Sequence, residues 1–513
     1  MLPFILLILD GWGISSQKKG NAIELAKTPC VDHFTINYPN ALLEASGQYV
    51  GLPKKQPGNS EAGHMNIGGG RTILQDIERI NQSINTEEFF KNTAFIQAIR
   101  QVKKNNSALH LMGLLSGKNS GHSYPLHLYS LLKLAQIHKL QKVYIHLFTD
   151  GRDSWHNEAI IFIKELEAKI AQYKTGKIAS LIGRFHAMDR NKGWKNTEHA
   201  YQLLIEGKAE KTFKDPEKAL NFYYQEGIND EFLPPIKIQH KEKTDIEEGD
   251  AIIFFNLRSD RARQLAKPFL QEKFIGFQRK KVLKNICFVA LTEFGPELPN
   301  ILTAFPAPYY HKNLVEIINT KTNFEQVYMA ESEKYPHITY FFNGGSANPI
   351  GSENRIMIPS PRTNNYAKTP LMRVDTLAIL ATDYIESSIY NFFVINFANP
   401  DMLGHTGNLK ATIKGIEYVD KYTALLARVV LKRGGTILVT ADHGNAEKMI
   451  DLETNQPFTS HTTNPVPFII INNKLKKNIK LKPRGKLGDI APTILELLKI
   501  DKPAEMKGES LIV

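Results

Sequence analysis

The sequence predicts an α/β protein built around a mostly parallel sheet flanked by helices, with a second α/β domain inserted into it. At 513 residues the chain is too long for one hydrophobic core, so at least two domains are expected. Similar apolar runs, each followed by acidic residues, occur at both ends of the chain, and the middle carries different motifs. We therefore expect residues 1–75 and 308–513 to form one domain and residues 76–307 to form the inserted one.

Three apolar runs define the first domain. Continuous apolar runs are typical of parallel strands that are covered on both faces. In open α/β sheets, ligands bind at the carboxyl ends of such strands, so the acidic residues that follow the runs are expected to converge on one site. The runs and their acidic residues are Phe4–Leu9 with Asp10, Phe392–Phe397 with Asp401, and Thr436–Thr440 with Asp442.

Histidines accompany these acidic residues. His405 follows Asp401, His443 follows Asp442, and His461 lies in a nearby Ser-His-Thr-Thr stretch. A single Asp–His pair is usually a structural hydrogen bond, but the repetition behind apolar strands favours metal binding. Mixed carboxylate and imidazole ligands suit Mn²⁺, Zn²⁺ and related ions. There are more candidates than one ion needs, and paired ions clamp both oxygens in phosphoryl transfer, so we expect two ions.

The stretch Gly58-Asn59-Ser60-Glu61-Ala62-Gly63-His64 predicts a nucleophile. Glycines let the backbone approach a ligand closely. A serine among free backbone N–H groups suits a nucleophile whose product is an anionic ester. Taken alone, the stretch favours a surface turn in which Ser60 caps a helix. The predicted metal cluster favours the nucleophile.

The inserted segment carries histidine, aspartate and arginine motifs, several of them behind strand-like runs such as 143–148 and 251–255. The arginine fork binds carboxylate and phosphate with two hydrogen bonds, so the cluster predicts a pocket for a small, multiply charged anion. Arg258 and Arg261 would share a face if both lay on a helix. Beyond the insert, Lys334 is a candidate charge for a developing oxyanion. The inserted candidates are His122, Arg152, Asp153, Arg184, Arg190, Arg258 and Arg261.

Composition limits the partners. The net charge of +12 favours anionic partners, among them phosphorylated molecules, nucleic acid and membrane surfaces. The densest basic run, 474–486, has no aromatic residue to stack on bases, so no nucleic-acid partner is expected. The apolar run 3–9 is too short to span a bilayer, so no membrane partner is expected. Two distant cysteines, Cys30 and Cys287, indicate a reducing cytoplasm.

Together, these motifs closely resemble the cofactor-independent phosphoglycerate mutases of the alkaline phosphatase superfamily. The resemblance covers nearly the whole chain. It implies an alkaline-phosphatase-like metal domain split between the two ends of the chain, with an inserted transferase domain. It also implies interconversion of 3-phosphoglycerate and 2-phosphoglycerate in glycolysis and gluconeogenesis, through a phosphoserine and without 2,3-bisphosphoglycerate. Mn²⁺ is the expected ion, with Co²⁺, Zn²⁺ and Mg²⁺ as alternatives, and the expected state is a monomer.

The resemblance also implies roles for single residues. Ser60 would carry the phosphoryl group and Asp153 would be the acid/base group. One ion would be held by Asp10, Ser60, Asp442 and His443, and the other by Asp401, His405 and His461. Substrate would be bound by His122, Arg152, Asp153, Arg184, Arg190, Arg258, Arg261 and Lys334.

The departures from the family pattern fall mainly in the insert. The usual Asp-Gly-Gly-Val-His-Ser-His is here the run 117–124, Gly-Lys-Asn-Ser-Gly-His-Ser-Tyr, one residue longer before His122. No implied catalytic residue is lost. A metal-dependent phosphatase or another phosphomutase of the superfamily is the alternative enzyme. A non-enzymatic anion-binding or nucleic-acid-binding protein is the alternative outside that class.

Overall fold

The computed structural model describes residues 2–118, 120–475 and 479–513, and the chain divides into two compact units. Unit 1 comprises residues 1–75 and 308–513, and unit 2 comprises residues 76–307. Each unit is built on an eight-stranded sheet, so the predicted α/β class is confirmed. Residues 476–478 of the basic run and residue 119 of the longer loop lie outside the described residues.

The sheet of unit 1 has the strand order β12-β11-β13-β1-β14-β15-β2-β16. Its first five strands are parallel, β15 is antiparallel to both of its neighbours, and β16 is parallel to β2. The strands are β1 (Phe4–Leu9), β2 (Asn40–Glu44), β11 (Gln326–Glu331), β12 (Glu353–Ile358), β13 (Phe392–Phe397), β14 (Thr436–Thr440), β15 (Val466–Ile471) and β16 (Arg484–Lys486).

The three predicted apolar runs are central strands of this sheet. They coincide with β1, β13 and β14, and every residue in them is buried. β1 pairs in parallel with β13 on one side and with β14 on the other. The carboxyl ends of the three strands therefore meet at one edge, as the sequence predicted.

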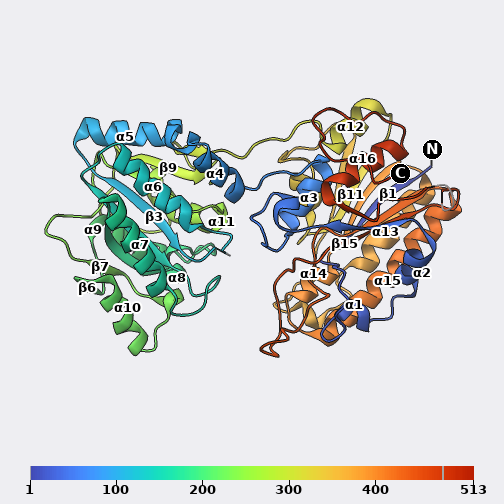
Figure 1. The fold of residues 1–513 in the computed structure, drawn as a ribbon, viewed down its shortest axis with the longest axis horizontal. Helices are drawn as coiled ribbons and strands as arrows, with labels where there is room; N and C mark the ends of the chain where they lie inside the picture. The colour runs from blue at the N-terminus through green and yellow to red at the C-terminus, as the bar shows by residue number, and fades with distance from the viewer. Residues whose placement is uncertain (1, 119, 476–478) are drawn as a thin grey trace. The chain divides into compact units, whose positions relative to one another are not determined.

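Helices cover both faces of this sheet (Figure 1). One face carries α1 (Ala22–Leu25), α2 (Pro29–Asn37), α13 (Val374–Ser387) and α15 (Leu409–Lys432), and the other carries α3 (Ser60–Gly69), α12 (Leu314–Lys321) and α16 (Ile490–Leu497). The shorter elements are α14 (Asn399–Gly404), η1 (Gly47–Val50), η4 (His337–Phe341), η5 (Tyr366–Lys368) and η6 (Leu487–Asp489). The apolar side chains of these layers form one continuous core.

Unit 2 contains a second sheet with the order β10-β9-β8-β3-β4-β5-β7-β6. All neighbouring strands are parallel except β5 and β7. The strands are β3 (Leu109–Leu115), β4 (Val143–Thr149), β5 (Lys177–Gly183), β6 (Lys211–Phe213), β7 (Ile236–Ile238), β8 (Ala251–Phe254), β9 (Cys287–Thr292) and β10 (Leu302–Phe305). The strand-like runs at 143–148 and 251–255 correspond to β4 and β8.

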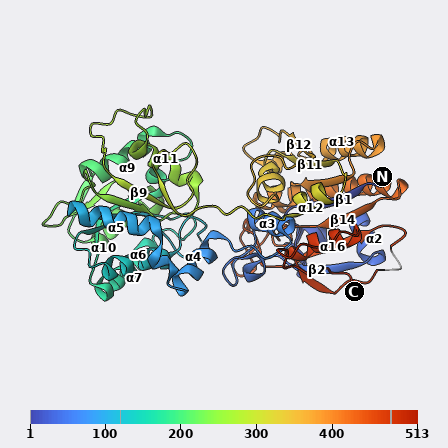
Figure 2. The same ribbon diagram turned by 90° about the horizontal axis from the view of Figure 1, so that it is seen from above.

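This sheet has a separate core on each face. Figure 2 shows helices on both sides of it. One core includes α4 (Asp76–Asn85), α5 (Thr93–Asn105), α6 (Pro125–Ile137), α7 (Ala159–Tyr173) and α10 (Pro216–Gln225), and the other includes α8 (Arg184–Ala187), α9 (Trp194–Glu206) and α11 (Ser259–Leu270). Two short 3-10 turns, η2 (Glu88–Lys91) and η3 (Asp230–Phe232), complete the unit.

None of the helices in the described part of the chain has the length and apolar content needed to cross a bilayer.

Candidate functional site

The first candidate site lies at the carboxyl edge of the unit 1 sheet. Asp10 directly follows β1, and Asp442 and His443 follow β14. Asp401 lies in α14, immediately after β13, and its backbone N–H donates to the carbonyl of Asp10 at 3.0 Å. The carboxylates of Asp10, Asp401 and Asp442 are buried. Residues separated by about four hundred positions in the sequence thus form one acidic cluster.

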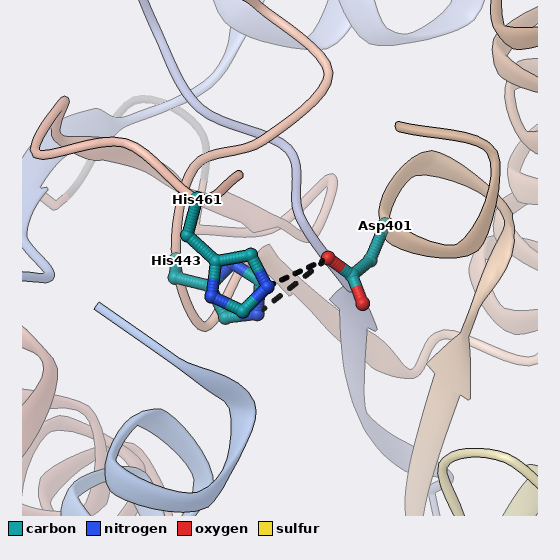
Figure 3. Close-up of side chains that lie close together, drawn as sticks. All are labelled: Asp401, His443 and His461. Atoms are coloured by element: carbon teal, nitrogen blue, oxygen red, sulfur yellow. Dashed lines mark ion pairs between the residues drawn. The ribbon is translucent and has the colours of Figure 1, made fainter. Parts of the chain in front are cut away.

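His443 and His461 lie against Asp401 (Figure 3). Asp401 Oδ1 is 3.2 Å from His461 Nε2 and 4.0 Å from His443 Nε2. His405 Nε2 approaches the same oxygen at 3.3 Å. The imidazoles of His443 and His461 and this carboxylate could share one cation, since their ligand atoms all lie within 4.8 Å of one another.

A second group of ligand atoms surrounds Asp442. His64 Nδ1 lies 3.2 Å from Asp442 Oδ2, and these two residues form a compact group with Asp10. His443 Nε2 lies between the two groups, 3.4 Å from Asp442 Oδ2 and 3.6 Å from Asp10 Oδ1. All seven residues predicted as metal ligands therefore belong to one continuous cluster.

Ser60 is the first residue of α3 and faces this cluster. Its Oγ is 3.0 Å from His443 Nε2 and 3.4 Å from Asp10 Oδ1. Asn59, and not Ser60, caps the helix, because its side chain accepts a hydrogen bond from the N–H of Ala62 at 2.9 Å. The hydroxyl of Ser60 is thus directed at the acidic cluster.

Lys334 carries a positive charge into the same place. Its Nζ donates to Asp10 Oδ1 at 2.5 Å, to Asp401 Oδ2 at 2.6 Å and to Ser60 Oγ at 2.8 Å. Burial opposes the charge on this ammonium, but Asp10 and Asp401 raise its pKa above the ordinary value. The lysine is therefore a fixed cation next to the candidate nucleophile.

The negative charge of the cluster exceeds the positive charge of Lys334, so the cluster can bind additional cations. Three buried carboxylates face one buried ammonium. Burial and the nearby Asp442 raise the pKa of Asp10 to about 7, as expected where negative charge is in excess. Asp442 Oδ2 is buried, and no group among the described residues donates a hydrogen bond to it. Burial lowers the pKa of His443 to about 3, which leaves its ring neutral and able to coordinate an ion.

Three residues that sequence reasoning did not assign support this cluster. Asn396 donates to Asp10 Oδ2 at 2.8 Å, and Asn445 donates to Asp401 Oδ1 at 2.7 Å. His64 contacts Asp442, as described above. Two signals were available in the sequence. Asn396 is the one polar residue in the apolar β13 run, and His64 follows Ser60 by one helical turn.

The second candidate site lies in unit 2, at the carboxyl ends of β4 and β5. Arg184, at the start of α8, is buried and lies 3.2 Å from Asp153 Oδ1. Burial opposes ionisation of Asp153, but Arg184 and the hydroxyl of Ser120 together hold its pKa below the ordinary value. Asp153 is therefore ionised at neutral pH.

His122 belongs to this second cluster. Burial, followed by Arg184 and Arg258, lowers the pKa of His122 to about 4, so the ring is neutral. Its Nδ1 is buried without a hydrogen-bond partner among the described residues. The guanidinium of Arg258 lies close to Gly121, the neighbour of His122. An unpaired polar atom next to an arginine is suited to a polar ligand.

The remaining arginines are more exposed. Arg190 Nη1 donates to Asp260 Oδ2 at 2.6 Å, and Arg152 Nη1 lies 3.8 Å from Glu231 Oε1. Arg261 lies in the first turn of α11. Arg258 precedes that helix with extended backbone, so the two do not share a helical face. Asp260 was not assigned from the sequence, although it lies between them.

The buried metal-type cluster and the α/β fold define a metal-dependent enzyme. The profile of the Metalloenzyme superfamily matches residues 2–502. At a finer level, the chain belongs to the family of 2,3-bisphosphoglycerate-independent phosphoglycerate mutases. The predicted resemblance is thereby confirmed.

Relatives of that name match the whole chain. The one from Chloroflexus aurantiacus J-10-fl is 44% identical, with 100% of this chain and 98% of the relative covered. The one from Clostridioides difficile 630 is 44% identical, with 99% of each covered. A crystal structure of phosphoglycerate mutase from Leishmania mexicana at low cobalt concentration is 30% identical, with a TM-score of 0.79 over 100% of this chain and 98% of that one.

Proposed function

We propose that this protein interconverts 3-phosphoglycerate and 2-phosphoglycerate without 2,3-bisphosphoglycerate, through a phosphoserine on Ser60. The observation that carries the proposal is the position of the Ser60 hydroxyl, which contacts Lys334 and His443 inside a cluster of three buried carboxylates. The full-length relatives support the same activity.

Ser60 is proposed as the nucleophile. A free serine hydroxyl is a weak nucleophile and needs a neighbour that favours the alkoxide. Lys334 Nζ donates to its Oγ at 2.8 Å, and this hydrogen bond strengthens as negative charge grows on the oxygen. The N-terminus of α3 adds a positive partial charge at the same place.

Two divalent ions are proposed at the unit 1 cluster. Asp10, Ser60, Asp442 and His443 would hold one ion, and Asp401, His405 and His461 the other. Such ions supply Lewis acidity, which stabilises the serine alkoxide and the charge on the phosphoryl oxygens. Mn²⁺ is the ion proposed, since carboxylate and imidazole ligands both suit it.

The unit 2 cluster is proposed to hold the glycerate part of the substrate. Arg184 and its neighbouring arginines would bind the carboxylate and hydroxyl groups, as planar guanidinium groups do. Asp153 is ionised at neutral pH, which is the form that accepts a proton from the glycerate 2-hydroxyl. The proposed substrate ligands are His122, Arg152, Asp153, Arg184, Arg190, Arg258, Arg261 and Lys334.

The bonds and protons balance over two transfers. In the first, the Oγ–P bond of Ser60 forms while the bond from phosphorus to the 3-oxygen breaks, and the 3-oxygen acquires the proton that the serine gives up. In the second, the 2-oxygen bonds to phosphorus while the Oγ–P bond breaks. Asp153 takes the 2-hydroxyl proton, which finally restores the serine hydroxyl.

The test supplies purified, metal-loaded protein with 3-phosphoglycerate and no bisphosphoglycerate, and then identifies the products. The proposal predicts 2-phosphoglycerate as the main product. Free phosphate as the main product would instead make the protein a phosphatase with the same metal site.

Three finer expectations stay predictions. They are the preference for Mn²⁺, the monomeric state and the cytoplasmic location. Elemental analysis of the protein isolated without added metal tests the first. Sedimentation equilibrium tests the second, and fractionation of the source cells tests the third.

A further inference from the structure

Asp150 contacts the turn that carries Asp153, the proposed acid/base group of unit 2, and has no role in the activity described so far. It directly follows β4 and is buried. Its Oδ1 accepts hydrogen bonds from Arg184 Nη1 at 2.5 Å, from the N–H of Arg152 at 3.2 Å and from the N–H of Asp153 at 3.0 Å. Its Oδ2 accepts a hydrogen bond from the hydroxyl of Ser116. One carboxylate thus fixes both the turn that carries Asp153 and the guanidinium that faces it.

Ser120 holds the carboxylate of Asp153 through its other oxygen, Oδ2. It is buried, its Oγ donates to Asp153 Oδ2 at 2.8 Å, and it accepts a hydrogen bond from the N–H of His122 at 3.1 Å. Ser120 belongs to the loop that is one residue longer than the usual family pattern. This hydroxyl links the positions of Asp153 and His122.

The contacts leave Asp153 fixed but still open to a ligand. Among the described residues, Arg184 contacts Oδ1 and Ser120 donates to Oδ2, so each oxygen has one such donor. An ionised carboxylate has about four acceptor positions, so each oxygen keeps room for a further donor. The side chain remains 24% exposed, and a substrate hydroxyl can reach it. A general base needs this combination of a fixed direction and a free lone pair.

We propose that Asp150 and Ser120 are positioning residues for this reaction. Ser120 contacts Asp153 and the backbone N–H of His122, whereas Asp150 contacts Asp153 and Arg184. The proposal rests on the proposed function in one respect, the acid/base role of Asp153.

The two positioning residues predict different kinetic changes. Ser120→Ala releases the base but leaves Arg184 held by Asp150, so it lowers kcat roughly 10- to 100-fold and leaves KM within about twofold, the loss expected for a misdirected catalytic group. Asp150→Asn also releases Arg184, so it lowers kcat by a similar factor and raises KM about fivefold or more. A merely structural role would lower the folded fraction without separating kcat from KM.

Matched control variants lie in the same unit, away from the cluster. Asp215 accepts from the N–H of Lys218 at 3.0 Å as the cap of α10, and Ser107 Oγ donates to the carbonyl of Gly249 at 2.8 Å. Ser107→Ala removes one comparable hydrogen bond, and Asp215→Asn removes a carboxylate charge while its amide oxygen can still cap the helix. Both are expected to keep kcat and KM within about twofold of wild type. Thermal unfolding of all four variants checks that each is folded at the assay temperature.

A double-mutant cycle decides the proposal for Ser120. If Ser120 affects turnover through Asp153, adding Ser120→Ala to Asp153→Asn lowers kcat no further, because the base that it positions is already gone. Equal losses in both backgrounds would overturn the proposal, as would a Ser120→Ala kcat within twofold of wild type. For Asp150, kcat and KM of Asp150→Asn that both stay within about twofold of wild type, as expected for Asp215→Asn, would overturn the proposal.

Failure of the proposed function would look different. Wild-type protein would then give no 2-phosphoglycerate, or Asp153→Asn would retain wild-type turnover. Either result refutes the role on which the positioning depends. The variant comparisons are therefore made only against a wild type with measured mutase activity.

Discussion

The side chains of Arg258 and Arg261 have different neighbours in unit 2. Arg258 is an exposed residue whose guanidinium lies close to Gly121, whereas Arg261 Nη1 donates to the carbonyl of Met188 at 3.2 Å. Burial, followed by the positive charges of neighbouring arginines, lowers the pKa of Arg261, so several cations lie near this side chain. An anion such as glycerate would relieve that repulsion.

We therefore predict that Arg258→Ala or Arg261→Ala lets glycerate escape before the second transfer. A charge-assisted hydrogen bond contributes roughly 1.5–3 kcal/mol, so escape should become about 10- to 150-fold faster. The ratio of free phosphate to 2-phosphoglycerate from labelled 3-phosphoglycerate measures this directly. Arg263→Ala is the control, because Arg263 lies on the same helix and bonds to Ser259 Oγ at 3.0 Å. An unchanged product ratio in both variants would refute the glycerate clamp.

At the scale of elements, α3 must pack closely against the end of β14. A Cβ on Gly63 would lie 2.5 Å from the carbonyl oxygen of Asp442 and 2.8 Å from its Cβ. Because a backbone atom cannot move aside as a flexible side chain can, only glycine fits here. This approach is what brings Ser60, one turn earlier, to the acidic cluster.

Gly63→Ala is therefore expected to separate α3 from Asp442. Overpacking of this kind costs typically 1–3 kcal/mol of unfolding free energy. Metal affinity should fall as well, because Asp442 moves. Urea unfolding and a metal titration measure the two effects, with Met65→Ala, at a partly exposed position of the same helix, as the control. Unfolding free energy and affinity both equal to those of wild type would contradict this account of the glycine.

Strands of both ends of the chain could be predicted from the sequence, whereas contacts between distant side chains could not. β1, β13 and β14 were predicted to the residue, because continuous apolar runs with an acidic residue shortly after them have few other interpretations. The three-residue spacing of Arg258 and Arg261 could not show whether both lie on a helix, because it is also compatible with the helix start that the structure has between them. The contacts of Asp150 with Arg184 and of Lys334 with Asp10 depend on tertiary packing, and no local pattern encodes them.

For the whole molecule, metal binding should depend on pH. In the metal-free protein, the pKa of Asp10 is raised to about 7. The pKa of His405 is also raised, because Asp401 outweighs the effect of burial. Both groups therefore carry protons below neutral pH and must lose them to bind an ion, so affinity falls as pH falls.

We predict that affinity for Mn²⁺ drops between pH 8 and pH 6 by up to about tenfold per pH unit for each proton released. Competition with a chelating indicator at several pH values measures the affinity. Calorimetry in buffers of different ionisation enthalpy counts the protons. Equal affinity at pH 6 and pH 8 would contradict the proposed ligands. Exhaustive chelation should abolish turnover until a divalent ion is restored.

The central claim is that the phosphoryl group passes through Ser60. The most direct measurement mixes metal-loaded protein with labelled 3-phosphoglycerate, quenches it in acid within one turnover and maps the labelled peptide. The account predicts phosphate on Ser60, formed and lost at rates that match turnover, and none in Ser60→Ala, which should be folded and lack mutase activity. Turnover by Ser60→Ala within tenfold of wild type, or label at a different residue, would contradict it.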